Sequence, residues 1–123
     1  MSASGPRERA ARPEDLSRLV LERLNAGDAD GLAALYEPDA VMALPDGGQA
    51  AGSREIRQAY KHLLTGGPTF APGEQQPTLR SGDLALTAVV LPGGGATVEV
   101  ARRQPDGTWL WVLDQPAFPA RNT

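Results

Sequence analysis

LAALYEPDAVMALPDGG, residues 32–48, is a stretch whose pattern changes at Pro38. Before this proline, apolar residues recur at helical spacing; after it, a short apolar run from Ala40 to Leu44 ends in a proline–glycine turn. Proline disfavours helical backbone in the residue before it and removes a backbone donor. The stretch therefore predicts a short helix ending near Tyr36, followed by a strand over residues 40–44.

Two more helices are predicted outside this stretch. Pro13 suits the first turn of a helix that ends near residue 25, with Gly27 as its left-handed cap. Asp28 is the expected N-cap of the short helix. Ser53 is the expected cap of a third helix over residues 54–64, and the state of residues 69–77 stays open.

The last third of the chain is predicted to form strands over residues 84–91, 96–103 and 108–114, joined by the turns PGGG and QPDG. Helices followed by antiparallel strands are typical of the α+β class. The segments predict a single domain over residues 13–118. A mobile N-terminal tail is expected at residues 1–12 and a C-terminal tail at 119–123.

The composition excludes several kinds of protein. The 123 residues carry 15 acidic and 12 basic side chains, a net charge of -3, which argues against nucleic-acid binding. The absence of cysteine excludes thiolate metal sites, and His62 is the only histidine, so no metal site is expected. No apolar run reaches the ~20 residues of a membrane span, and the N-terminus lacks a secretory signal. We expect a cytoplasmic protein.

Three segments together resemble one family: GDADGLAALYEPDAVM, GSREIRQAY and ARRQPDGTWLWVLD. In order and spacing they are similar to the nuclear transport factor 2-like superfamily, in its SnoaL-like and ketosteroid-isomerase-like branch of bacterial proteins, over residues 16–114. The resemblance implies a cone-shaped fold in which a strongly curved antiparallel sheet wraps three N-terminal helices around an apolar pocket. It also implies a homodimer through the outer face of the sheet.

The isomerase branch uses a carboxylate base with an oxyanion hole of tyrosine and a protonated acid. By resemblance, the tyrosine position falls on Val20, the base position on Leu44 and the acid position on Glu99. Valine cannot donate a hydrogen bond and leucine cannot take a proton, so steroid isomerase chemistry by that mechanism is not expected. Two supporting tyrosine positions fall on Tyr36 and Tyr60.

Glu99 lies between two valines in the strand ATVEVARR. Alternation places its side chain on the opposite face from theirs. If the valines face an apolar layer, Glu99 points into the cavity, where burial raises the pKa of a carboxyl group. With reversed parity it is a solvated strand residue paired with Arg80 or Arg103.

Asp114 follows the apolar run WLWVL. It is either a polar group of the site, sharing a face with Val112, or a strand-ending aspartate that caps a turn. Trp109 and Trp111 fall on the other face and are predicted at the homodimer interface, where aromatic residues are enriched.

These observations predict a pocket for a small hydrophobic molecule. As an enzyme the protein would be a cofactor-free isomerase, cyclase or hydratase acting on a hydrophobic carbonyl or epoxide compound; the alternative is a non-catalytic ligand-binding or dimerisation module. Glu99 is the expected proton-transfer residue and Asp114 a second polar group. The expected substrate contacts are Tyr36, Tyr60, Met42, Leu44, Leu64, Val20 and Val112.

Overall fold

A computed structural model describes residues 7–118 of the chain. Within these residues there are three helices: α1 (Asp15–Asn25), α2 (Ala29–Ala33) and α3 (Gly52–Leu63). The seven strands of the same part are β1 (Tyr36–Ala43), β2 (Gln49–Ala51), β3 (Glu74–Gln75), β4 (Leu79–Ser81), β5 (Leu84–Val90), β6 (Ala96–Arg103) and β7 (Trp109–Phe118). The predicted C-terminal tail, residues 119–123, and residues 1–6 of the N-terminal one lie outside the described residues.

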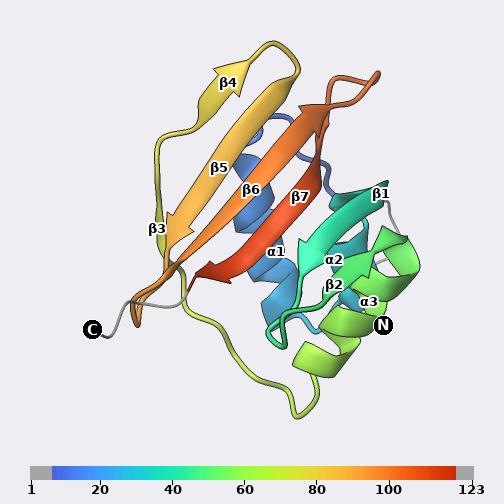
Figure 1. Ribbon diagram of the computed structural model, residues 1–123, viewed down its shortest axis with the longest axis vertical. Helices are drawn as coiled ribbons and strands as arrows, with labels where there is room; N and C mark the ends of the chain where they lie inside the picture. The colour runs from blue at the N-terminus through green and yellow to red at the C-terminus, as the bar shows by residue number, and fades with distance from the viewer. Residues whose placement is uncertain (1–6, 119–123) are drawn as a thin grey trace.

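All seven strands belong to one sheet, in the order β2-β1-β7-β6-β5-β3, with β4 also paired to β5. Figure 1 shows α1 behind β5, β6 and β7, while α2 and α3 lie beside β1 and β2. The predicted α+β class is confirmed. The sheet is mixed rather than wholly antiparallel, because β1 runs parallel to β7.

Two of the three predicted helix-end residues have their expected roles in the structure. Asp28 accepts a hydrogen bond from the backbone N–H of Gly31 at 3.0 Å, as expected of an N-cap. Gly27 has a φ of 68°, as its predicted role after α1 requires. Ser53, however, does not cap α3, which begins one residue earlier. Glu55 instead accepts a hydrogen bond from the N–H of Ala51 at 2.8 Å.

Strand β1 begins at Tyr36, four residues before the predicted strand, and it includes Pro38. The proline is tolerated because the pairing of β1 with β7 shifts register between Tyr36 and Val41. Proline lacks the N–H that a regular ladder position uses. Thus Pro38 does not separate a helix from a strand but lies within an irregular strand. Strand β2 was not predicted, since its sequence QAA lacks β-branched and aromatic residues.

The core lies between the helices and the inner face of the sheet. It includes Leu16 and Leu19 of α1 and, from β7, both tryptophans. Trp109 and Trp111 are 2% and 3% exposed in the single chain. Their predicted position on the outer face at a homodimer interface is therefore wrong.

The segment before α1 also differs from the expected mobile tail. Ala10 is buried and forms an isolated antiparallel bridge with Trp109, whose N–H donates to the carbonyl of Ala10 at 2.9 Å. Arg7 pairs with Asp28 at 2.9 Å. Residues 7–12 are thus part of the fold. None of the described helices is long and apolar enough to cross a membrane.

Candidate functional site

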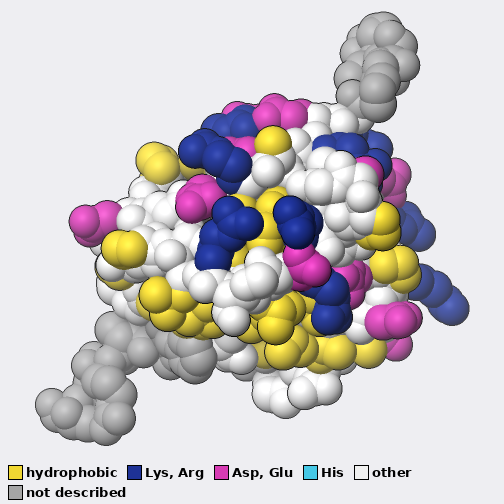
Figure 2. All heavy atoms as spheres, turned by 90° about the horizontal axis from the view of Figure 1, so that it is seen from above, with side chains coloured by type: hydrophobic (Ala, Val, Ile, Leu, Met, Phe, Trp, Pro, Cys, Tyr) yellow, Lys and Arg dark blue, Asp and Glu magenta, His cyan; other side chains and the backbone are white. Residues whose placement is uncertain are grey.

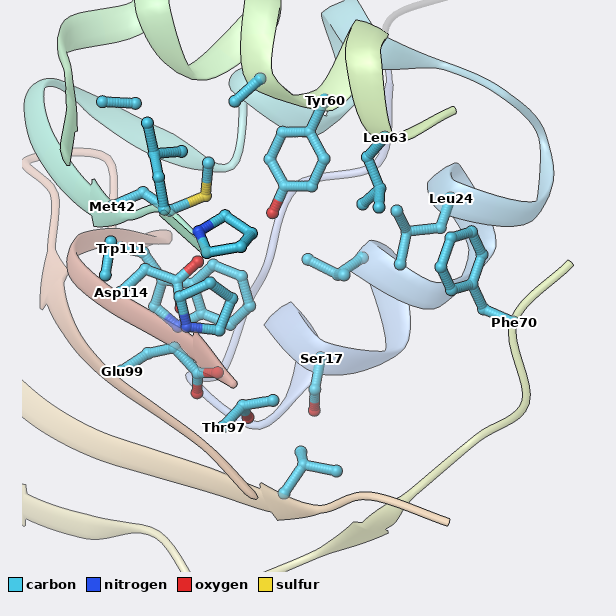
Figure 3. A pocket seen from close by; sticks show the side chains of 18 of the residues that line it. Ser17, Leu24, Met42, Tyr60, Leu63, Phe70, Thr97, Glu99, Trp111 and Asp114 are labelled. Carbon is cyan, nitrogen blue, oxygen red and sulfur yellow. The ribbon is translucent and has the colours of Figure 1, made fainter. Parts of the chain in front are cut away.

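A cavity of about 1610 Å³ opens between α1, α3 and the inner face of the sheet. Pockets for small molecules commonly measure about 300–1,000 Å³, so this one has room for a multi-ring compound. Figure 3 shows two unlike ends. Side chains of Glu99, Asp114 and Trp111 gather at one end, and those of Leu63 and Phe70 lie at the other.

Glu99 reaches the cavity from the middle of β6. The residue is 4% exposed, and the hydroxyl of Thr87 on β5 donates to its Oε1 at 2.7 Å. Burial raises the pKa of Glu99. Of the two positions that alternation left open, the structure shows the inward one. The alternative partners are occupied elsewhere: Arg80 lies over the ring of Trp109, and Arg103 pairs with Asp83.

Asp114 reaches the same end of the cavity because of a β-bulge. Ala101 of β6 pairs with Trp111 of β7, but the preceding Val100 pairs with Leu113, so Val112 is an extra residue. A bulge reverses the alternation that follows it, and Asp114 therefore shares the inner face with Trp111. It neither shares a face with Val112 nor ends the strand, because β7 continues for four more residues.

A chain of hydrogen bonds holds Asp114 from behind. The hydroxyl of Tyr36 donates to Oδ2 of Asp114 at 2.5 Å, and the hydroxyls of Tyr36 and Tyr60 are 2.6 Å apart. The single hydroxyl hydrogen of Tyr36 is used in its hydrogen bond to Asp114, so Tyr60 is the donor in the bond between the two tyrosines. Burial raises the pKa of both tyrosines, so both remain protonated.

The two carboxyl groups face each other across neighbouring strands. Glu99 is the register partner of Asp114, and side chains in such pairs stand with Cβ atoms about 4.5–5.5 Å apart. Burial, assisted by the negative charge of Glu99, raises the pKa of Asp114 to about 7, although the hydrogen bond from Tyr36 works in the other direction. Near neutral pH Asp114 is therefore partly protonated.

Some of the predicted substrate contacts line the cavity and others do not. Val20, Met42, Leu44 and Tyr60 line the cavity. Three predicted residues do not line it: Tyr36 is buried behind Asp114, Val112 lies on the bulge, and Leu64 borders a separate small pocket between α2 and α3.

Sequence reasoning missed three residues of the site. Thr87 alternates with Ala85 on β5, and this pattern could have placed it on the inner face. Phe70 lies in the segment whose state was left open, where its backbone forms two hydrogen bonds with the side chain of Asn25, at 2.7 and 3.1 Å. Trp111 was assigned to the other face.

Comparisons with known proteins agree with this geometry. Residues 17–115 match the sequence model of the SnoaL-like domain family. A putative calcium/calmodulin-dependent protein kinase type II association domain from Thiobacillus denitrificans has a similar structure, with a TM-score of 0.78 and 17% identity, over 94% of this chain and 100% of that one. No curated protein sequence matches.

Two other solved structures with a similar fold come from proteins described as ketosteroid isomerase-like and nuclear transport factor 2-like. A ketosteroid isomerase-like protein from Erwinia carotovora atroseptica has a TM-score of 0.66 and 20% identity, over 83% of this chain and 89% of its own. A nuclear transport factor 2-like superfamily protein from Salmonella enterica has a TM-score of 0.66 and 16% identity, over 89% of each chain. At such identities the likeness shows the fold alone.

Proposed function

We propose, since this chain belongs to the SnoaL-like domain family, that its cavity binds a small hydrophobic carbonyl or epoxide compound and performs acid–base chemistry on it without a cofactor. The observation that carries the proposal is the pair of buried carboxyl groups, Glu99 and Asp114, at one end of a mainly apolar cavity. Acidic side chains are almost never buried unless they are paired or functional.

The pair has the properties of a proton-transfer device. When two neighbouring carboxyl groups hold one proton, the ionised group can remove a proton from the substrate and the neutral group can donate one. The pKa of Asp114, raised to about 7, lies near neutral pH, where such a group works best. The reactions this favours are isomerisation, cyclisation or hydration.

The tyrosines take different parts in this proposal. The hydroxyl of Tyr60 lies at the cavity wall, where it touches the ligand. Tyr36 acts through Asp114: its hydrogen bond to Oδ2 fixes the carboxyl group and leaves Oδ1 without a partner. Tyr36 is thus a positioning residue.

A non-catalytic ligand-binding or association module is the second candidate. Val20 and Leu44 stand at the positions where the isomerase branch has its proton donor and base, and both line the cavity here. The similar structure from Thiobacillus denitrificans is described as an association domain. These observations favour a protein that holds a ligand without changing it.

A homodimer through the outer face of the sheet belongs to the same proposal, with different residues from those expected. Leu79 pairs in register with Leu86, Leu86 with Val100, and Val100 with Leu113. The three leucines are 65%, 38% and 51% exposed, and we call this cross-strand row the outer row. Figure 2 also shows a band of apolar side chains along one edge of the molecule. A second copy, packing sheet against sheet, would cover the row.

Exchange of carbon-bound hydrogen tests the catalytic proposal. In D2O the wild-type protein should speed deuterium uptake next to the carbonyl of 2-tetralone, an apolar two-ring ketone, or hydrate styrene oxide. Glu99→Gln and Asp114→Asn should each lower the rate at least about 100-fold, the usual share of a general acid or base. The affinity for the apolar dye N-phenyl-1-naphthylamine should stay nearly unchanged in both variants.

The matched control is Glu74→Gln, which removes the charge of an exposed carboxyl group on β3 and should leave the rate unchanged. If the wild-type protein binds the dye but neither exchanges the ketone nor hydrates the epoxide, the enzyme proposal fails and the binding module stands.

A further inference from the structure

Polar atoms without a hydrogen-bond partner are concentrated at one end of the cavity. Among the described residues, four buried side-chain polar atoms have no partner: Thr78 Oγ1, Thr97 Oγ1, Trp111 Nε1 and Asp114 Oδ1. All but the first belong to residues that line the cavity. Figure 3 shows these side chains close to Glu99.

The indole N–H of Trp111 is the most informative of these atoms. Indole nitrogen can only donate, so no change of protonation relieves it. Buried donors are almost always paired in folded proteins, because an unpaired one loses its hydrogen bond to water and gains nothing. Trp111 is 3% exposed and Asp114 7% exposed, so bulk water does not satisfy either atom, and both residues line the cavity.

Tyr36 holds both groups in place. Its ring packs edge-on against the ring of Trp111, with centroids 5.5 Å apart and planes at 61°, and its hydroxyl engages Oδ2 of Asp114. The free indole N–H and the free carboxyl oxygen therefore belong to side chains that are fixed by the same residue. Such preorganisation is typical of a recognition site, because less ordering is needed when the ligand binds.

We infer that Trp111 Nε1 and Asp114 Oδ1 form the recognition end of the cavity, and that the ligand is a neutral apolar compound ending in a hydroxyl or enol oxygen. This oxygen accepts a hydrogen bond from Trp111 and donates one to Asp114. The inference rests on the proposed function, since it uses the same cavity.

The chemistry at this end of the cavity argues against other chemical groups there. A hydrocarbon leaves both polar groups unpaired, and a carboxylate or phosphate would meet the negative charge of Glu99 beside Asp114. A hydroxyl oxygen both accepts and donates, so one atom can satisfy both groups. The apolar body of the ligand then lies against Leu24, Leu63 and Phe70 at the other end.

Two probes that differ by one oxygen test this inference: naphthalene and 2-naphthol. Wild-type protein should bind 2-naphthol at least about tenfold more tightly, as expected for hydrogen bonds that satisfy buried groups. Trp111→Phe, which removes the N–H and keeps an aromatic ring, should lose most of this preference. Trp109→Phe makes the same change at a buried position that does not line the cavity, and should keep the preference.

A second measurement uses the wild-type protein alone, so it does not require that any variant folds. The chain has two tryptophans, so its indole N–H groups give two NMR signals. Addition of 2-naphthol should move the Trp111 signal downfield and leave that of Trp109 in place, while naphthalene should produce no such downfield shift.

The outcomes separate the two proposals. If naphthalene and 2-naphthol bind equally well, or if the Trp111 signal does not respond to 2-naphthol, the recognition end is disproved while the cavity and its chemistry stand. If neither compound binds, the inference fails together with the proposed function.

Discussion

Each face of the sheet carries some side chains that do not favour the stability of a single chain. The covered inner face buries Glu99 and Asp114, whereas the open outer face exposes the leucines of the outer row. A buried carboxyl group raises the free energy of the folded state, and an exposed leucine contributes little. This difference supports both proposals: that the inner face binds a ligand and that a second copy covers the outer one.

The largest effect should come from pH acting on the inner face. The pKa of Asp114 is about 7 in the folded chain and about 4 when unfolded, so the folded state holds the proton more tightly. Stability should therefore fall as pH rises from about 4 to 7, by about 1.4 kcal/mol per pH unit and up to about 4 kcal/mol in all. Urea unfolding at several pH values measures it.

Asp114→Asn is the control for this effect, because its amide cannot ionise. The variant should lose most of the slope, and Glu99→Gln should lose part of it, since the charge of Glu99 adds to the raised pKa. An equal slope in wild type and Asp114→Asn would show that the inner face does not hold the proton.

The outer face should give the next largest effect. Replacing Leu86 and Leu113 together with lysine should weaken the homodimer at least about 100-fold, or about 3 kcal/mol, because buried apolar area is lost and charge is placed in the interface. Sedimentation at several concentrations measures the dissociation constant. A wild-type chain that stays monomeric, or a double variant that dimerises as wild type does, would contradict this role of the outer row.

The smallest effects should distinguish the two tyrosines of the inner face. Tyr36→Phe leaves Oδ2 of Asp114 without its donor and should lower the free energy of unfolding by about 2 kcal/mol. Tyr60→Phe keeps that bond and should lower it by about 1 kcal/mol. Thermal unfolding ranks them, and the reverse order would show that Tyr36 does not hold Asp114.

The same two strands show how far sequence reasoning reaches. Alternation on β6 left two positions open for the side chain of Glu99, inward or solvated, and the structure shows the inward one. Asp114 was predicted in the site on the same face as Val112, but Val112 is one extra residue that reverses the alternation along β7, so Asp114 shares the inner face with Trp111 instead. A bulge is fixed by pairing with a neighbouring strand, so the sequence of one strand carries little sign of it.

The stretch around Pro38 shows the same limit of sequence reasoning. Pro38 predicted a boundary between helix and strand, yet the strand already begins at Tyr36. The proline lies where β1 and β7 shift register, and this contact joins residues more than 70 positions apart in the chain. Local propensity therefore located the helices and the three long C-terminal strands, while tertiary pairing decided the details of the site.

The raised pKa of Asp114 is measured most directly by following the carboxyl carbons of Glu99 and Asp114 by NMR from pH 4 to 9. The Asp114→Asn and Glu99→Gln variants identify the two signals. The account predicts that the Asp114 signal titrates near pH 7 and moves to lower pH in Glu99→Gln, where the neighbouring negative charge is absent. Two independent titrations near pH 4 would contradict the account.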